Sequence, residues 1–314
     1  MSLTSQLRDP NSPVARFFAE NFPDHRGFAS AWSKRVRLLP TIRPEGATAD
    51  YPWPLVGAAL DYRIRVCWEA YPAESTVAAL GGGEGGYLPI SSDGLALLWA
   101  NLSSRWNAMM DCIAGRDRCS LRADLEDALA RMSMALAAFE AVFRSGQLPE
   151  MLSRALGEPG GADELLRRIP DAVVADLVRL IDGFAGSDHR YLHPRSIVLN
   201  PTFDGSSMVG GADADVILDQ ILWDFKATIR PERTTYWPYQ LLGYGLLDFG
   251  DRFRLEGAGI YLARQKTWVS WSWPELMDLL GMEGSWDIQE WRGRFAAHLL
   301  GGRQWRGAGA IDDV

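Results

Sequence analysis

The segment GGADADVILDQILWDFKAT, residues 210–228, constrains the fold more than any other part of the chain. Two apolar runs flank the dipeptide Asp219-Gln220, and their branched and aromatic residues are typical of β-strands. A two-residue connection predicts a hairpin in which Leu218 pairs with Ile221 and Val216 pairs with Trp223. We therefore expect a β-sheet that is built around this hairpin.

The same register is expected to bring charged side chains together. Asp215 should lie opposite Asp224, and Asp213 opposite Lys226, with all four side chains on one face because side chains alternate along a strand. Facing carboxylates repel each other by up to about 1 kcal/mol unless a cation offsets them. Oxygen ligands of this kind suit Mg²⁺ or Mn²⁺, so the hairpin predicts a divalent metal site. A lysine that is salt-bridged on a polar sheet face is the alternative interpretation.

Most of the remaining chain shows the helical spacing of apolar residues, and its length and 47% hydrophobic content suffice for one large domain with an insertion. Charged residues of the central part, Glu126 among them, are expected on a solvated face. Helices are expected over residues 54–71, in three segments between about 95 and 184, over 235–249 and over 287–300. Strands are expected within residues 195–203, 212–218, 221–229 and 257–273. These elements predict an α/β fold class.

Composition and charge limit the classes of function. The formal net charge of −8 argues against a protein that coats nucleic acid through bulk positive charge, although a local basic cleft stays possible. Cys67, Cys112 and Cys119 are too few for a four-cysteine zinc or iron–sulfur site and are expected to be buried free thiols. No run approaches 18 uncharged apolar residues, and the N-terminus lacks a signal-peptide pattern. A cytoplasmic protein without a membrane partner is expected.

Three short motifs resemble those of the PD-(D/E)XK nuclease superfamily. GADADVIL followed by LWDFKAT is similar to its core, in which an aspartate on one strand and an acid-x-lysine on the next bind metal. QLLGY, residues 240–244, resembles the Q-x-x-x-Y helix of the RecB-like, exonuclease-type branch. GAALD, residues 57–61, occupies the place of the G-x-x-x-H motif of that branch, with Asp61 where histidine is usual. The resemblance covers only about residues 57–72 and 196–265.

The resemblance implies a restriction-endonuclease-like core, with a central mixed β-sheet flanked by helices and a helical insertion. Residues 1–90 would then form an N-terminal segment with the first core helix. Residues 91–188 would be the helical insertion, and residues 189–314 the nuclease core.

The resemblance also implies which groups bind the metal. Asp215 and Asp224 would bind Mg²⁺ or Mn²⁺, with the carbonyl group of Phe225 as a further ligand. Asp213 is the alternative ligand if the hairpin register differs from the expected one. Asp61 would complete the site, or it would instead pair with Arg65 one helical turn away.

The remaining motif residues would act on the substrate. Lys226 would position the attacking water, Gln240 would hold that lysine or a phosphate group, and Tyr244 completes the catalytic set.

The resemblance implies a metal-dependent nuclease whose expected substrate is DNA. Candidate phosphate contacts are Arg63, Arg65 and the segment SKRVR, which contains Lys34 and Arg35. The alternative is a non-cleaving nucleic-acid-binding or assembly module, whose helical insertion docks a protein partner. A metal-dependent hydrolase of a smaller substrate is a third possibility.

Overall fold

The chain divides into two compact units in the computed structural model, which describes residues 2–48, 50–83, 93–156, 161–233, 236–282 and 287–301. The sheet unit consists of residues 1–40, 194–226 and 230–314, and the helical unit consists of residues 41–193 and 227–229. Among the described residues, no helix is both long enough and apolar enough to span a membrane.

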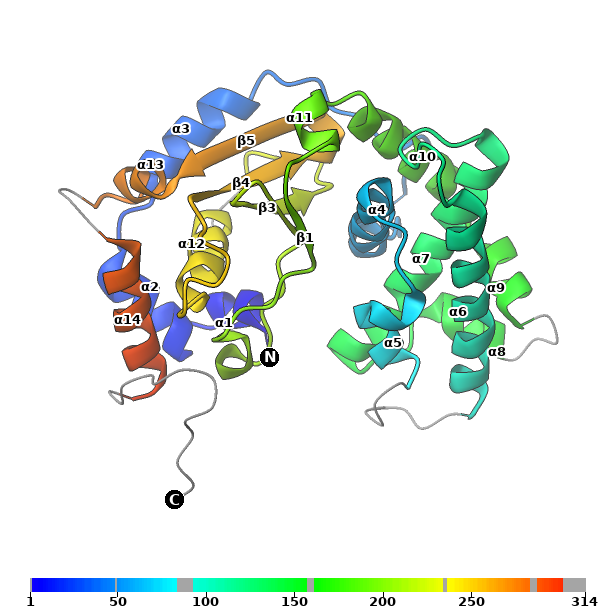
Figure 1. Ribbon diagram of the computed structural model, residues 1–314, viewed down its shortest axis with the longest axis horizontal. Coiled ribbons are helices and arrows are strands. Elements are labelled where there is room, and N and C mark those ends of the chain that lie inside the picture. Colours follow the sequence, from blue (N-terminus) through cyan, green and yellow to red (C-terminus); the bar gives the residue numbers. More distant parts are fainter. Residues whose placement is uncertain are drawn as a thin grey trace. The chain divides into compact units, whose positions relative to one another are not determined.

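The sheet unit contains a five-stranded mixed sheet with the strand order β1-β2-β3-β4-β5 (Figure 1). The strands are β1 (Ile197–Leu199), β2 (Val216–Leu218), β3 (Ile221–Lys226), β4 (Gly257–Leu262) and β5 (Thr267–Ser272). Neighbouring strands are antiparallel except for β3 and β4, which are parallel. The mixed sheet with its helices confirms the expected α/β class.

The hairpin of β2 and β3 has the register that the sequence predicts. Leu218 pairs with Ile221, and Val216 pairs with Trp223. Asp219 and Gln220 have φ values of 47° and 68°, the left-handed conformation that a type I′ turn requires at both central residues. The Asp219 carboxylate also accepts hydrogen bonds from the backbone N–H groups of Arg195 at 2.8 Å and Ser196 at 2.9 Å. This aspartate therefore ties the turn to the start of β1.

Helix α12 (Trp237–Leu247) makes the crossover that two parallel strands require and packs against the sheet (Figure 1). Its Leu241 and Leu242 belong to the same buried core as Leu222 of β3 and Ile260 of β4. Residues of even number on β3 and β4 thus face α12. Because side chains alternate along a strand, Asp224 lies on this face as well.

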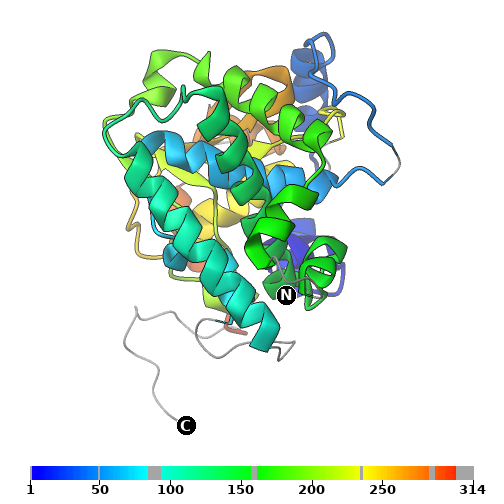
Figure 2. The same ribbon diagram turned by 90° about the vertical axis from the view of Figure 1, so that its right-hand side faces the viewer.

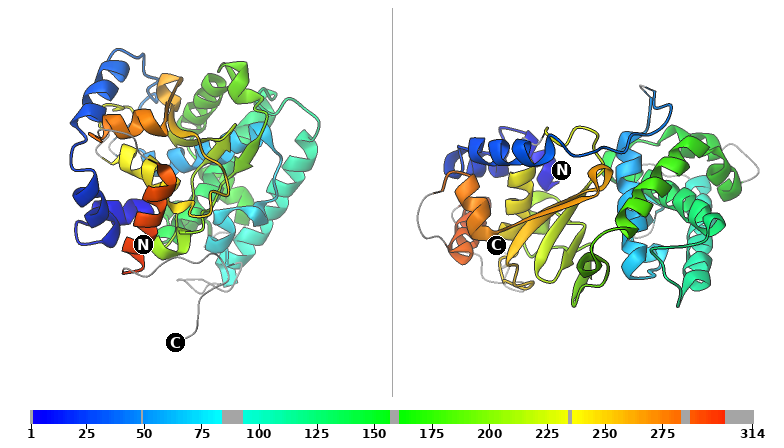
Figure 3. Two further views of the ribbon diagram at one scale, coloured as in Figure 1. Left: turned by 60° about the vertical axis from the view of Figure 1, so that its left-hand side comes forward. Right: turned by 90° about the horizontal axis from the view of Figure 1, so that it is seen from above.

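The two ends of the described chain pack together within the sheet unit (Figures 1 and 3). The ring of Phe17 lies 4.7 Å from that of Phe295, between the centroids, and Phe18 and Phe22 extend this aromatic cluster. The helices of this layer are α1 (Leu3–Arg8), α2 (Pro13–Asn21), α3 (Arg26–Val36), α13 (Trp273–Leu279) and α14 (Ile288–Leu299). Residues 1–40 consequently belong to the sheet unit.

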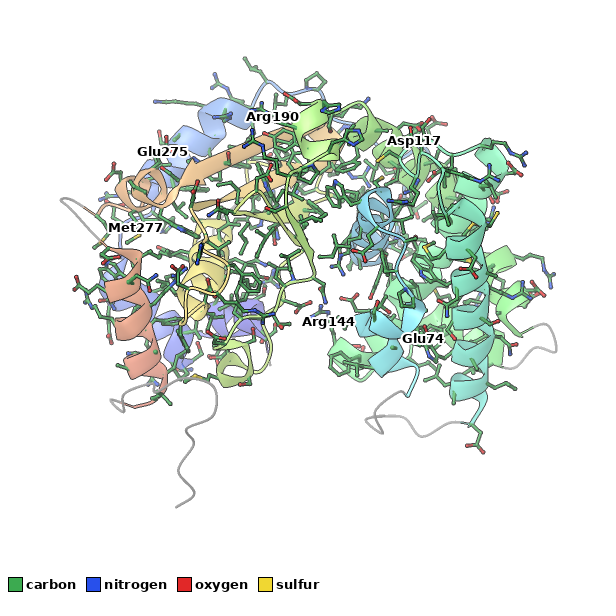
Figure 4. The ribbon with its side chains drawn as sticks, in the orientation of Figure 1. Glu74, Asp117, Arg144, Arg190, Glu275 and Met277 are labelled. Carbon is green, nitrogen blue, oxygen red and sulfur yellow. The ribbon has the colours of Figure 1, made fainter. Side chains whose placement is uncertain are left out.

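Side chains cap the N-terminus of helix α13. The Ser272 hydroxyl accepts the backbone N–H of Glu275, whose carboxylate accepts the backbone N–H of Ser272 in return. Met277 on the same helix is fully buried in the core; Figure 4 labels both Glu275 and Met277. This capping box fixes the point at which the edge strand β5 turns into a helix.

The helical unit is formed by helices alone among its described residues (Figure 2). The long helices α4 and α7 pack together, with α5 and α10 also against α7. Its helices are α4 (Trp53–Trp68), α5 (Val77–Gly81), α6 (Asp93–Ile113), α7 (Ala123–Ser145), α8 (Glu150–Leu156), α9 (Gly161–Arg168), α10 (Asp171–Ala185) and α11 (His189–Leu192), with the 3₁₀ turn Ala73–Ser75. The expected first core helix, α4, thus belongs to the same unit as the expected insertion. The compact units therefore differ from the segments 1–90, 91–188 and 189–314.

The three cysteines are free, but only part of the expected burial is confirmed. Cys67 at the end of α4 is buried, Cys119 is half-buried, and Cys112 is exposed. The prediction for Cys112 is wrong because it lies on the outer side of α6, whose buried residues include Met110 and Ile113.

Gly259 on β4 supplies a stability test of the sheet. A Cβ atom at this position would lie 2.4 Å from the Trp223 ring and 2.7 Å from the Val269 carbonyl oxygen. We expect Gly259→Ala to lower the free energy of unfolding by about 1–3 kcal/mol, measured by urea denaturation. Gly293→Ala is the control, because open space surrounds this exposed helical position; it should raise stability by about 0.5–1 kcal/mol. Equal effects of the two substitutions would contradict the packing described.

Candidate active site

Strand β3 delivers Asp224 and Lys226 to the face of the sheet that α12 covers. The Asp224 side chain is only 6% exposed, and that of Lys226 is 21% exposed. The Lys226 Nζ atom lies 2.5 Å from the Asp224 Oδ2 atom. The acid-x-lysine motif therefore forms a largely buried ion pair and does not lie on a solvent-exposed face of the sheet.

Helix α12 extends this ion pair into a chain of polar contacts. Lys226 Nζ donates to the Oε1 atom of Gln240 at 3.2 Å, and Gln240 Nε2 donates to the Tyr244 hydroxyl at 3.0 Å. Gln240 and Tyr244 lie one helical turn apart, so they present their side chains on the same side of the helix. One connected group is thus formed by the residues that the two motifs predicted separately, Asp224, Lys226, Gln240 and Tyr244.

Aromatic rings surround the two ends of this group. The Lys226 Nζ atom lies 5.6 Å from the centroid of the Trp237 ring, a cation–π distance. Tyr244 stacks on Phe203, with ring centroids 5.7 Å apart and an interplanar angle of 28°. Trp237 and Phe203 have no counterpart among the predicted site residues. The only sequence signal for Trp237 is its position at the start of the helix that carries Gln240.

The pKa of Tyr244 is shifted by burial and by the acidic side chains near it. Burial raises the pKa of Tyr244 well above its ordinary value, and the negative charges of Asp224, Asp215 and Asp213 raise it further. The hydrogen bond from Gln240 opposes this shift. The Tyr244 hydroxyl is therefore a weaker acid than an exposed tyrosine and stays neutral.

Asp215 lies next to β3, but not as a member of the strand ladder. Its Oδ2 atom accepts the backbone N–H of Phe225 at 2.5 Å. Its own carbonyl oxygen accepts the backbone N–H of Asn200 at 3.0 Å, on the β1 side of the sheet. The chain bends at Asp215, where β2 has not yet begun, and the side chain replaces a main-chain contact to β3.

The expected pairing of Asp213 with Lys226 is wrong. Asp213 forms an isolated antiparallel bridge with Thr202, and the neighbouring Ala214 N–H donates to the Pro201 carbonyl oxygen at 3.2 Å. Because the chain bends at Asp215, residues before it pair with the segment that follows β1. The predicted hairpin register therefore holds from the turn as far as the pair Val216 and Trp223, and it does not continue to Asp213.

The donor atoms at this site fit a hard divalent cation. Asp224 Oδ2 is buried, and the Lys226 ammonium lies 2.5 Å from it. No three His, Cys, Asp or Glu side chains in the described part of the chain gather as a metal-binding group. Mg²⁺, however, is commonly held by one or two carboxylates together with water and substrate phosphate. Asp224 on β3 and Asp215 beside β3 are the two carboxylates of this kind at the site.

Asp61 forms one of the two contacts that its sequence context left open. It lies on α4 in the helical unit, where its carboxylate forms an ion pair with Arg65, including an Nε–Oδ1 hydrogen bond of 2.9 Å. The side chains of Asp61 and Arg65 are 14% and 8% exposed. The pairing with Arg65 is therefore formed, and a role for Asp61 as a metal ligand stays a prediction.

Arg63 is not available for phosphate contacts in this structure. Its side chain is fully buried and donates to both carboxylate oxygens of Glu126, at 2.8 and 2.6 Å. Glu126 is itself buried, so the expectation that it lies on a solvated face of α7 is also wrong. The amphipathic pattern could not reveal this pair, because the two residues are 63 positions apart in sequence.

Arg65 is likewise buried beside its acidic partner, whereas Lys34 and Arg35 on α3 are exposed. Of the candidate phosphate contacts, the segment SKRVR alone therefore presents its basic side chains to solvent.

No protein-family model, no curated protein and no solved structure matches this chain. The geometry and chemistry of the site residues therefore carry the functional inference.

Arg63 gives a stability prediction that separates a structural role from a binding role. Arg63→Ala should lower the free energy of unfolding by about 3–5 kcal/mol, because it leaves the Glu126 carboxylate buried without its cation. The double variant Arg63→Met/Glu126→Leu should recover most of that loss, since it removes both charges. Arg35→Ala, at an exposed position, should change stability by less than about 0.5 kcal/mol. Urea denaturation that finds Arg63→Ala as stable as the wild type would contradict the buried pair.

Proposed function

We propose that the protein is a metal-dependent nuclease that hydrolyses phosphodiester bonds in DNA and has a restriction-endonuclease-like core. The observation that supports this most strongly is the connected group of Asp224, Lys226, Gln240 and Tyr244. The acid-x-lysine and Q-x-x-x-Y motifs resemble nuclease motifs separately, and the fold brings them into contact. Their meeting at one buried position is difficult to reconcile with two unrelated solvated motifs.

Mg²⁺ or Mn²⁺ would be held by Asp224, Asp215 and the carbonyl group of Phe225. The largely buried Asp224 carboxylate and the Asp215 carboxylate, which lies against Phe225 of the same strand, support this assignment. When bound, the ion supplies Lewis-acid polarisation of a phosphate oxygen and offsets the negative charges of the site. Asp213 stays a candidate for an outer contact, because its charge reaches the same region.

Lys226 acts in this proposal as a charged donor that is held at one end of the site. Asp224 fixes its ammonium electrostatically, Gln240 accepts one of its N–H bonds, and the Trp237 ring lies beside it. An ammonium group has three N–H donors, so further donors can point at a water or at a phosphate oxygen. Lys226 would thus position the attacking water and stabilise the negative charge that develops on the phosphate group.

Gln240 and Tyr244 support this lysine. Because the Gln240 amide donates to Tyr244 through Nε2, its oxygen is directed toward Lys226. Tyr244 is in turn fixed by burial and by its stacking on Phe203. These two residues determine the orientation of Lys226 without reacting themselves, which agrees with the depth at which they lie.

A non-cleaving nucleic-acid-binding or assembly module is the competing function. Such a module needs no buried acid–lysine pair, and burying one without a functional requirement is often less stable than an apolar pair of similar volume. Nucleic-acid binding without metal-dependent cleavage would favour this alternative.

Cleavage assays test the proposed function directly. We expect wild-type protein to cut DNA with Mg²⁺ or Mn²⁺ and not with EDTA, and we expect Asp224→Asn and Lys226→Ala to reduce the rate at least about 100-fold. The assay uses linear, circular and single-stranded DNA and RNA. Lys266→Ala is the control, since this exposed lysine follows β4 outside the site.

Circular dichroism establishes that each variant keeps its secondary structure and melting transition. Full activity in either site variant, or equal cutting in EDTA, would contradict the proposed mechanism.

A further inference from the structure

The C-terminal end of α3 carries an exposed cluster of basic residues, Lys34, Arg35 and Arg37, named here the α3 basic end. All three side chains are exposed. None of them forms an ion pair or side-chain hydrogen bond with a residue that the structure describes, in contrast to Arg63 and Arg65. In a chain with a net charge of −8, these three residues concentrate positive charge at one end of a helix.

Helix α3 is fixed to the segment that leaves the candidate active site. The buried Trp32 of α3 donates from Nε1 to the Pro231 carbonyl oxygen at 2.6 Å. Its ring lies 5.8 Å from the Trp237 ring, which is the ring beside the Lys226 ammonium. The proposed catalytic Lys226 is therefore connected to α3 through two successive contacts, Lys226 with Trp237 and Trp237 with Trp32.

The segment after β3 adds further positive charge beside Pro231. Arg230 and Arg233 are both exposed, and only Glu232 between them is acidic. Near the start of α3, the acidic side chain of Asp24 is already paired with Arg26, at 2.7 Å. The α3 basic end, Arg230 and Arg233 thus bring five exposed basic side chains to the segments that meet at the Trp32–Pro231 hydrogen bond.

An ordinary role exists for basic residues at the end of a helix. A cation in the last turn of a helix offsets the helix dipole, and Lys34 and Arg35 occupy that turn. Arg37 lies beyond the last helical residue, and Arg230 and Arg233 are not on the helix at all. Helix stabilisation consequently does not account for the whole positive surface.

We propose that the α3 basic end, together with Arg230 and Arg233, binds the phosphate backbone of the nucleic acid and leads it to Lys226. This inference rests on the proposed nuclease function and names the surface on which its substrate lies. Each strand of a duplex carries one phosphate for every 3.4 Å or so of helix axis, so a continuous stretch of backbone can contact both the surface and the site. Contacts of this kind position the substrate without reading its sequence.

A binding measurement without metal tests this surface separately from cleavage. Fluorescence anisotropy follows a labelled 20-nucleotide single strand and the matching duplex in EDTA, over a range of salt concentrations. The test variant is Lys34→Gln/Arg35→Gln/Arg37→Gln. The matched control is Arg8→Gln/Arg16→Gln/Arg254→Gln, which removes the same charge from exposed arginines of the same unit that have no ion-pair partner among the described residues.

We expect the test variant to bind at least about tenfold more weakly at 100 mM salt, with a salt dependence of log K shallower by about 2–3. The control should stay within about twofold of the wild type. Equal weakening in test and control variants, unchanged binding by the test variant, or no binding by the wild type would each overturn the inference. Binding that depends on the α3 basic end, without any cleavage in Mg²⁺ or Mn²⁺, would support this surface and contradict the nuclease function.

Discussion

The burial of the Asp224 carboxylate beneath α12 is the constraint on which the site depends. Removing a carboxylate from water costs several kcal/mol unless a cation and hydrogen bonds offset the loss. Lys226 provides that cation from the same strand, and Gln240 and Tyr244 hold Lys226 from the crossover helix. The parallel pairing of β3 and β4 requires this crossover, and the crossover places α12 over the even-numbered face of β3. Helix α12 is therefore both the crossover that the sheet requires and the helix that carries Gln240 and Tyr244.

The first forty residues complete the support of that element. Helix α1 contacts α12, the aromatic residues of α2 pack on α14, and Trp32 of α3 bonds to the segment between β3 and α12. A region without any catalytic motif thus helps to fix the start of α12, where Trp237 lies beside Lys226. The same region carries the exposed basic residues Lys34, Arg35 and Arg37 that we assign to substrate binding. Trp32 thus contacts both the segment after β3 and the Trp237 ring beside Lys226.

The sequence predicted the elements whose causes are local. The Asp219-Gln220 turn determined the hairpin register, and alternation along β3 placed Asp224 and Lys226 on one face. Features that depend on distant partners were missed. Asp213 pairs with Thr202 because the chain bends at Asp215, and the sequence contains no signal for this bend. Arg63 is buried because Glu126, distant in sequence, lies next to it in the fold. The place of residues 1–40 in the sheet unit depends likewise on aromatic contacts with the far end of the chain.

Direct titration with Mn²⁺ tests the central claim that this acid–lysine group forms a divalent metal site. Electron paramagnetic resonance follows the signal of free Mn²⁺ as protein is added. We expect one bound ion per chain, with an affinity for Mn²⁺ at least about tenfold lower in Asp224→Asn. Asp219→Asn is the control, because it removes the same charge from the same hairpin. It should bind Mn²⁺ as the wild type does, since the Asp219 side chain hydrogen-bonds to the start of β1 and lies outside the site. Equal loss in both variants, or no binding by the wild type, would contradict the account.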